Sequence, residues 1–152
     1  MGKLKESYLR DACGEYLKRL SAYCSLTVTE IAEERISQDP SPAQIAAGLA
    51  AEGKKILSAL SKSAVKIALC VEGESLTSPG LAKLLEDAAK TGAKGVCFII
   101  GGSHGLSDEV KNACDRRLSL SSMTFPHQLF RVMLLEQIYR GFTIVSGGKY
   151  HK

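Results

Sequence analysis

The stretch Gly95-Val96-Cys97-Phe98-Ile99-Ile100-Gly101-Gly102-Ser103-His104-Gly105 decides the fold of this 152-residue chain. Residues 96–100 are all apolar and rich in β-forming side chains. A short apolar run of this kind is typical of a strand buried on both faces of a parallel sheet. Glycines follow at once, so we expect backbone N–H groups to be accessible where this strand ends.

Strand and helix patterns alternate on both sides of this stretch. Serine-proline pairs at 41–42 and 78–79 are start signals for two of the helices, and Gly92 is a stop signal. We expect helices at residues 4–23, 42–60, 78–92, 107–114 and 126–142, and strands at 27–32, 65–71, 95–100 and 118–121. The alternation predicts an α/β fold in one domain, residues 1–152, with a mainly parallel sheet and helices on both faces.

The composition excludes several classes of protein. The five cysteines form no C-x-x-C pair and there are only three histidines, which argues against a disulfide scaffold or a metal site. Apolar runs fall far short of the roughly 20 residues that span a bilayer, and no secretory signal opens the chain. We therefore expect a cytoplasmic protein with reduced thiols, no metal and no membrane association.

Positive charge gathers at the end of the chain. Residues 111–152 hold seven lysines and arginines against two acidic residues, whereas the total formal charge is only +4. A basic end suits a polyanionic partner such as RNA, because phosphate contacts release counterions. A solvated basic surface is the alternative.

The last predicted helix is apolar around nearly its whole circumference. Its apolar residues are Leu129, Phe130, Val132, Met133, Leu134, Leu135, Ile138, Tyr139 and Phe142. A helix that is apolar all round is buried all round. It must be tucked into the fold or packed against another subunit, and we predict a homodimer.

Three strand ends are candidate ligand sites, because parallel sheets bind ligands at the carboxyl ends of their strands. These ends are Leu69-Cys70, Gly101-Gly102 and residues 120–125. The glycine loop matches neither the Walker A pattern nor the dinucleotide fingerprint, and an ordinary strand-to-helix turn explains it equally well. Residues 121–128 can be read as a capped loop, and residues 147–152 as a frayed end.

Together these segments resemble the RlmH family of SPOUT-class methyltransferases, which methylate N3 of a pseudouridine in large-subunit ribosomal RNA. The matching stretches run almost end to end, at residues 2–6, 69–73, 98–106, 118–132, 136–140 and 150–152. Each piece is short, but the combination of GGSHG, MTFPHQ and the final YHK is specific.

The resemblance implies a C-terminal trefoil knot, an obligate dimer and S-adenosyl-L-methionine as cofactor, with 23S rRNA of the assembled ribosome as substrate. The motif positions implied for the cofactor pocket are Leu69, Gly101, Leu120, Ser121, Ser122, Met123, Thr124 and Phe125. Members of the family usually begin with a strand before the segment that matches residues 2–5. Only Met1 precedes this segment here, so that strand is expected to be missing, either because the start has been assigned late or because this protein lacks it.

Methylation of an imide N3 requires loss of its proton, and therefore a base or a cation that stabilises the anion. We expect His151 to be the base and Tyr150 to stack on an RNA base. Arg140 and Arg131 are candidates for phosphate or imide contacts, and His127 is as well explained as a structural cap. Two alternatives remain, a catalytically silent RNA-binding module of the same fold and a methyltransferase for another RNA or for a small molecule.

Overall fold

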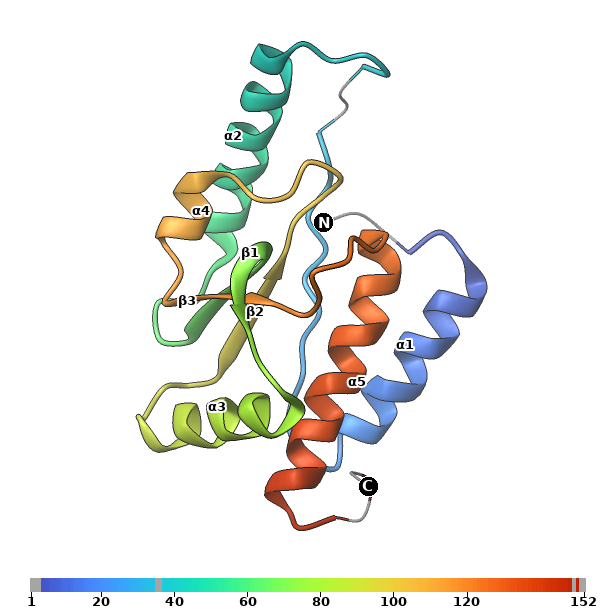
Figure 1. The fold of residues 1–152 in the computed structure, drawn as a ribbon, viewed down its shortest axis with the longest axis vertical. Coiled ribbons are helices and arrows are strands. Elements are labelled where there is room, and N and C mark those ends of the chain that lie inside the picture. Colours follow the sequence, from blue (N-terminus) through green and yellow to red (C-terminus); the bar gives the residue numbers. More distant parts are fainter. Residues whose placement is uncertain (1–3, 35–36, 149, 151–152) are drawn as a thin grey trace.

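The computed structural model describes residues 4–34, 37–148 and 150 (Figure 1). Along the chain lie α1 (Ser7–Leu20), α2 (Pro42–Ala59), β1 (Val65–Ser75), α3 (Ser78–Lys90), β2 (Val96–Ile100), α4 (Asp108–Asn112), β3 (Arg116–Ser119) and α5 (His127–Val145). The three strands form one sheet in the order β2-β1-β3, and β1 is parallel to both of its neighbours. The predicted α/β fold with a parallel sheet is confirmed.

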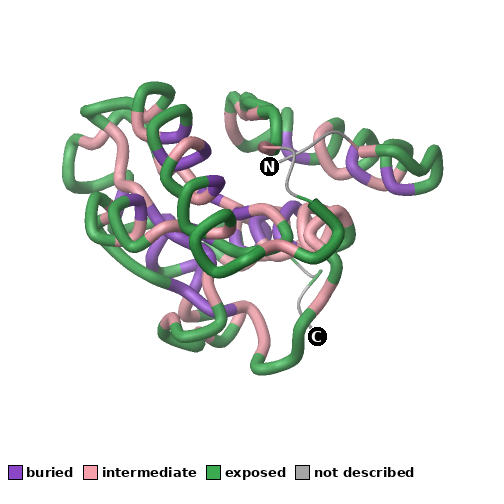
Figure 2. Tube along the Cα trace, turned by 90° about the horizontal axis from the view of Figure 1, so that it is seen from above, coloured by how far each residue is buried: buried purple, intermediate pink, exposed green. Residues whose placement is uncertain are grey.

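Helices cover both faces of this sheet. Ile67, Leu69 and Leu118 point to one face and pack with buried residues of α1, α3 and α5. Ala68 and Ile99 point to the other face and pack with α2 and α4. Successive residues of a strand point to opposite faces, which explains why the apolar runs in β1 and β2 are continuous. Figure 2 shows the buried residues in the interior, between the exposed outer turns of the helices.

The start signals of the helices operate much as expected. Ser41 accepts a hydrogen bond from the Gln44 N–H, and the Gln44 side chain accepts one from the Ser41 N–H, which completes a capping box. The N-cap of α3 is Thr77, one residue before the predicted Ser78, because the Thr77 hydroxyl accepts the Gly80 N–H. Gly92 follows the end of α3 with φ +75°, a conformation that glycine adopts without strain.

The prediction of a strand at residues 27–32 is wrong. This segment is coil in the structure, and among the described residues no backbone–backbone hydrogen bond involves it. Its ties are side-chain contacts instead, including an ion pair between Glu30 and Arg131 of α5 at 2.7 Å. The alternating pattern of β-branched residues favours an extended chain, but a strand also needs a hydrogen-bonded neighbour.

The last strand lies two residues earlier than predicted. β3 pairs with β1 from Arg116 to Ser119, and Asp115 accepts the Lys66 N–H at 2.7 Å just before it. The Ser119 hydroxyl donates to the Ser121 carbonyl at 2.9 Å. This local bond turns the chain out of the sheet before Leu120, so the polar residues that follow form a loop.

Helix α5 packs against α1 and α3 and ends at Val145, three residues later than predicted. Leu134, Leu135 and Ile138 are buried, but Leu129 and Val145 are 38 % and 47 % exposed. One chain therefore does not cover the whole apolar surface of this helix. In the part of the chain that the structure describes, no helix is long and apolar enough to cross a bilayer.

Candidate functional site

The three predicted ligand-binding segments meet at one edge of the sheet. Leu69 of β1 lies opposite Ile100 at the end of β2, and on its other side opposite Leu118 near the end of β3. The segments that follow β2 and β3 therefore leave the sheet beside one another. We call this place, formed by Leu69, Ile100, Leu118 and the loops after them, the carboxyl edge.

The glycine loop after β2 is a tight turn. Gly105 N–H donates to the Gly102 carbonyl at 3.1 Å, and Gly105 has φ +80°. Gly101 is buried, and a Cβ added to it would lie 2.3 Å from the Gly105 carbonyl oxygen. No other residue type fits at position 101 without a shift of backbone, so this glycine shapes the carboxyl edge.

Strand β1 makes a second close approach there. Both Leu69 and Glu74 lie opposite Leu118, so residues 70–73 bulge out of the ladder between them. A Cβ on Gly73 would lie 2.4 Å from the Leu118 backbone. Val71, at the top of this bulge, is 62 % exposed. The bulge thus raises an apolar side chain beside the carboxyl edge.

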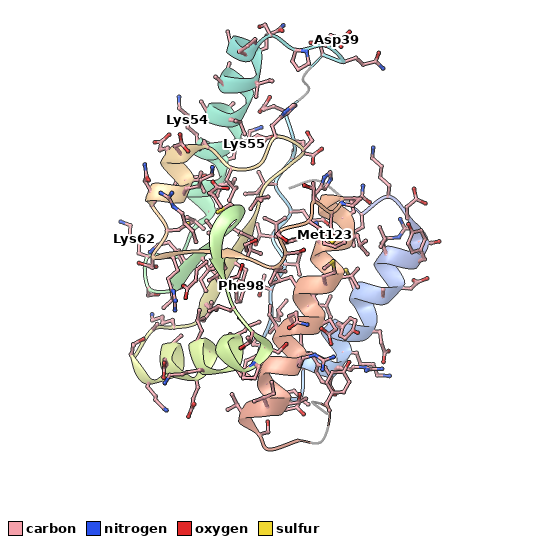
Figure 3. The ribbon with its side chains drawn as sticks, in the orientation of Figure 1. Asp39, Lys54, Lys55, Lys62, Phe98 and Met123 are labelled. Carbon is pink, nitrogen blue, oxygen red and sulfur yellow. The ribbon has the colours of Figure 1, made fainter. Side chains whose placement is uncertain are left out.

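The predicted cofactor run, residues 120–125, is a loop that leads from β3 to α5. The Ser121 hydroxyl accepts the Met123 N–H at 2.9 Å, which stabilises the turn. Ser122, Met123 and Thr124 are exposed, and Met123 is 68 % exposed. Figure 3 shows Met123 close to the start of α5. Leu69, Gly101 and this run are therefore brought to one edge, as the sequence predicts.

Arg140 and Tyr150, two predicted catalytic residues, also lie together. The Arg140 guanidinium is 4.7 Å from the centre of the Tyr150 ring, a cation–π contact. Both bind Glu136 Oε1, with Arg140 Nη2 at 2.6 Å and the Tyr150 hydroxyl at 3.4 Å. The hydrogen bond to Glu136 raises the pKa of Arg140, so the guanidinium stays charged. The predicted base, His151, lies outside the described residues.

A cavity of about 330 Å³ lies between the start of the cofactor run and Glu136, the residue that binds Arg140 and Tyr150. Leu120 of the cofactor run lines it together with Glu136 and Gln137 of α5. Tyr16 of α1 and the apolar Val132 and Met133 complete the lining. Leu120, just after the carboxyl edge, and Glu136 of the ion pair therefore border one space.

A second cavity, of about 550 Å³, lies beside the glycine loop, where the sequence pattern predicts no site. Ser103 and His104 face Glu33, Glu34 and the buried Glu52 across it. The Glu34 N–H donates to Glu52 Oε1 at 2.9 Å. Three carboxylates repel phosphate, so this cavity does not suit an RNA backbone. The only sequence signal was the Glu33-Glu34 pair.

His127 and Arg131 are engaged in structural contacts. His127 Nε2 lies 3.4 Å from Glu33 Oε1, and Arg131 Nη1 lies 2.7 Å from Glu30 Oε1. These pairs tie the coil at residues 26–34 to α5. The pairing of Arg131 counts against its predicted role in binding phosphate. The contact of His127 with Glu33 is structural, but it is not the predicted cap, since no side-chain hydrogen bond caps the start of α5.

The cysteines show no sign of a reactive thiol. Burial raises the pKa of Cys13, Cys24 and Cys97, so these thiols stay protonated. Among residues 4–34, 37–148 and 150, no group of three or more histidine, cysteine or acidic side chains could hold a metal ion. The chemistry available at the carboxyl edge is thus that of backbone amides, hydroxyls and the charged groups of α5.

Comparison with known proteins shows the family of this chain. A family described as "Predicted SPOUT methyltransferase" matches residues 1–151. The chain is 47 % identical to ribosomal RNA large subunit methyltransferase H of Clostridioides difficile, over all 152 residues and 96 % of that protein. It is 46 % identical to the protein of that name from Bacillus pumilus, with the same coverage. The chain therefore belongs to the SPOUT methyltransferase family, in the branch of the large-subunit ribosomal RNA methyltransferases H.

Proposed function

We propose that this protein transfers a methyl group from S-adenosyl-L-methionine to N3 of a pseudouridine in 23S rRNA of the assembled ribosome. Methyl transfer to large-subunit rRNA is the activity named for its relatives. The observation that carries the proposal is the register of the sheet, which sets Leu69 between Ile100 and Leu118. One chain of residues 1–152 would form a single domain with a C-terminal trefoil knot.

The residues at the carboxyl edge suit an adenosyl cofactor. Gly101 carries no side chain that would separate a ligand from the backbone of β2. Val71 and Met123 are large apolar side chains that are mostly exposed, and both lie on segments that leave this edge. A flat, partly apolar ligand would cover such side chains, while the loop at residues 120–125 offers backbone N–H and C=O groups. The cofactor supplies a methyl carbon on a sulfonium, which is already electrophilic.

The chain must then orient the RNA base and help N3 lose its proton. Arg140 can stabilise the developing imide anion, and the Tyr150 ring can stack on a base. We assign the proton acceptor to His151, one residue beyond Tyr150. Arg140 and Tyr150 support this arrangement because they lie next to each other and both bind Glu136, which lines the same cavity as Leu120.

The enzyme would act as a homodimer in the cytoplasm. Tyr8 of α1 is 65 % exposed, and Leu129 and Val145 of α5 are partly exposed, although all three are large and apolar. Met133 also lines an open cavity between these two helices. A second copy of the chain would cover this surface. Light scattering at micromolar concentration should give twice the monomer mass, and a monomer would contradict the dimer.

Three measurements test the proposed function. S-adenosyl-L-methionine should raise the melting temperature, and the protein should methylate ribosomes from a strain that lacks the gene but not free rRNA fragments. Nucleoside analysis should then identify N3-methylpseudouridine. Stabilisation without transfer to any RNA would indicate a silent binding module, and transfer to another RNA would overturn the proposed substrate.

A further inference from the structure

One ion pair on α5 differs from the other pairs of its kind. Among the described residues, three ion pairs have the same spacing of four residues along a helix: Glu15–Arg19, Glu86–Lys90 and Glu136–Arg140. The side chains of the first two pairs are 43–64 % exposed, whereas Glu136 and Arg140 are 18 % and 25 % exposed. Exposed pairs of this type contribute little to stability. A sheltered pair at the end of a cavity needs a separate explanation.

The carboxylate of Glu136 holds more than one partner. Its Oε1 accepts from Arg140 Nε at 3.0 Å and Nη2 at 2.6 Å, and from the Tyr150 hydroxyl at 3.4 Å. Its Oε2 accepts from Gln137 Nε2 at 2.6 Å. Gln137 Oε1 in turn accepts from the Ser78 hydroxyl at the start of α3, at 2.9 Å. Gln137 thus links the Glu136 carboxylate to α3, and the carboxylate holds Arg140 and Tyr150 side by side.

Only part of the Arg140 fork is used by this contact. Glu136 binds Nε and Nη2, and within the described residues no acceptor is bonded to Nη1. The Tyr150 ring stacks edge-on against Tyr139, with ring centres 5.0 Å apart, and lies beside the guanidinium. The arrangement thus places a cation, whose Nη1 binds no acceptor among the described residues, next to an aromatic ring.

We infer that Glu136 is a positioning residue, which holds Arg140 and Tyr150 as one unit for an anionic, base-bearing substrate. This inference rests on the proposed function. An arginine and a tyrosine in a chain end lose much conformational freedom when they bind. Glu136 orders both side chains before the substrate binds, so less conformational freedom is lost on binding. Glu136 itself lines the cavity that Leu120 also lines.

If Glu136 acted only through its negative charge, neutralising it would have the opposite effect on the enzyme. A carboxylate near an RNA site repels phosphate, so its neutralisation alone should tighten RNA binding. A positioning role requires that neutralisation slow methyl transfer, because Arg140 loses its fixed orientation. The two roles can therefore be separated by Glu136→Gln, which keeps the size of the side chain.

The experiment compares Glu136→Gln, Arg140→Ala and the double variant with the wild type, on unmethylated ribosomes with labelled S-adenosyl-L-methionine. Glu86→Gln is the control, since it breaks an exposed pair of the same spacing on α3. Glu136→Gln should lower kcat on the order of 10- to 100-fold, with unchanged cofactor affinity and an unchanged pH profile. The double variant should lose much less activity than the product of the two single effects, because Glu136 acts mainly through Arg140 and otherwise only through Tyr150.

Three results would overturn the inference: activity equal to that of Glu86→Gln, additive effects in the double variant, or a shifted pH profile, which would make Glu136 itself a proton acceptor. The Arg140 Nε–H resonance in nuclear magnetic resonance spectra gives a readout without turnover. It should be protected from exchange in the wild type and not in Glu136→Gln, and equal protection in both contradicts the inference. A wild type that methylates no ribosomes but shows this difference would refute the proposed function alone.

Discussion

The carboxyl edge and the Glu136–Arg140–Tyr150 group are built by different means. At the carboxyl edge the backbone makes the shape, since the closest approaches are those of Gly101 to Gly105 and of Gly73 to Leu118. On α5 the side chains of Arg140 and Tyr150 form the arrangement, through hydrogen bonds to the Glu136 carboxylate. The first region is therefore sensitive to an added carbon atom, and the second to a lost charge.

The largest effect is expected for Gly101→Val. The new side chain meets the Gly105 backbone, which cannot rotate away, so the loop and its hydrogen bonds must move. Stability should fall by about 3 kcal/mol, and calorimetry should detect no binding of S-adenosyl-L-methionine. The control is Gly14→Ala in α1, where nothing lies within 4 Å. Gly14→Ala should raise the free energy of unfolding by about 0.5–1 kcal/mol. Normal cofactor binding by Gly101→Val would show that the glycine loop is not part of the cofactor site.

Arg140→Ala should impair methyl transfer and leave stability and cofactor binding nearly unchanged, the reverse of Gly101→Val. It removes a cation without any change of backbone, so the melting temperature should fall slightly and the affinity for S-adenosyl-L-methionine should stay the same. Methyl transfer to ribosomes should fall on the order of 100- to 1000-fold, as for the loss of a group that stabilises an anion. Comparable kcat in variant and wild type would show that Arg140 is only a structural partner of Glu136.

The smallest effect is expected for Asp115→Asn, at the other end of β3. The Lys66 N–H donates to the Asp115 carboxylate and lowers its pKa. A lowered pKa adds stability above the unfolded value of about 4, and this stability is lost as the pH falls through the folded value. The free energy of unfolding of the variant should therefore fall less between pH 6 and pH 2.

This difference should stay under about 1 kcal/mol, because the Asp115 side chain is half exposed. Urea titrations across that pH range measure it. Cofactor binding at neutral pH should be unaffected, since Asp115 lies at the amino end of the strand. Parallel pH curves for variant and wild type would show that the bond to Lys66 contributes nothing.

The carboxyl edge was largely predictable from the sequence, whereas the group on α5 was predictable only in part. Apolar runs that end in glycine or polar residues mark strand ends, and parallel strands bring those ends together. The chemistry of Arg140 and Tyr150 makes them candidates from the sequence, but no local pattern indicates that Glu136 holds both. Fourteen positions separate Glu136 from Tyr150, and such contacts depend on where the chain end folds back.

The error at residues 27–32 has a related cause. Alternation of β-branched residues reports a preference for extended backbone, and that preference is local. Whether the backbone pairs depends on the neighbour that the fold supplies. Here the described neighbours contact this part of the chain through side chains, in the pairs Glu30–Arg131 and Glu33–His127.

The sequence by itself determined the alternation of strands and helices, the two-sided burial of the sheet and the glycines that shape its carboxyl edge. These features follow from side-chain size, apolar period and backbone freedom, all of which are local properties. Only the tertiary structure decided that Leu69 lies between Ile100 and Leu118, and that Leu120 shares a cavity with Glu136. Register and cavities depend on packing between distant segments, which no stretch of sequence contains alone.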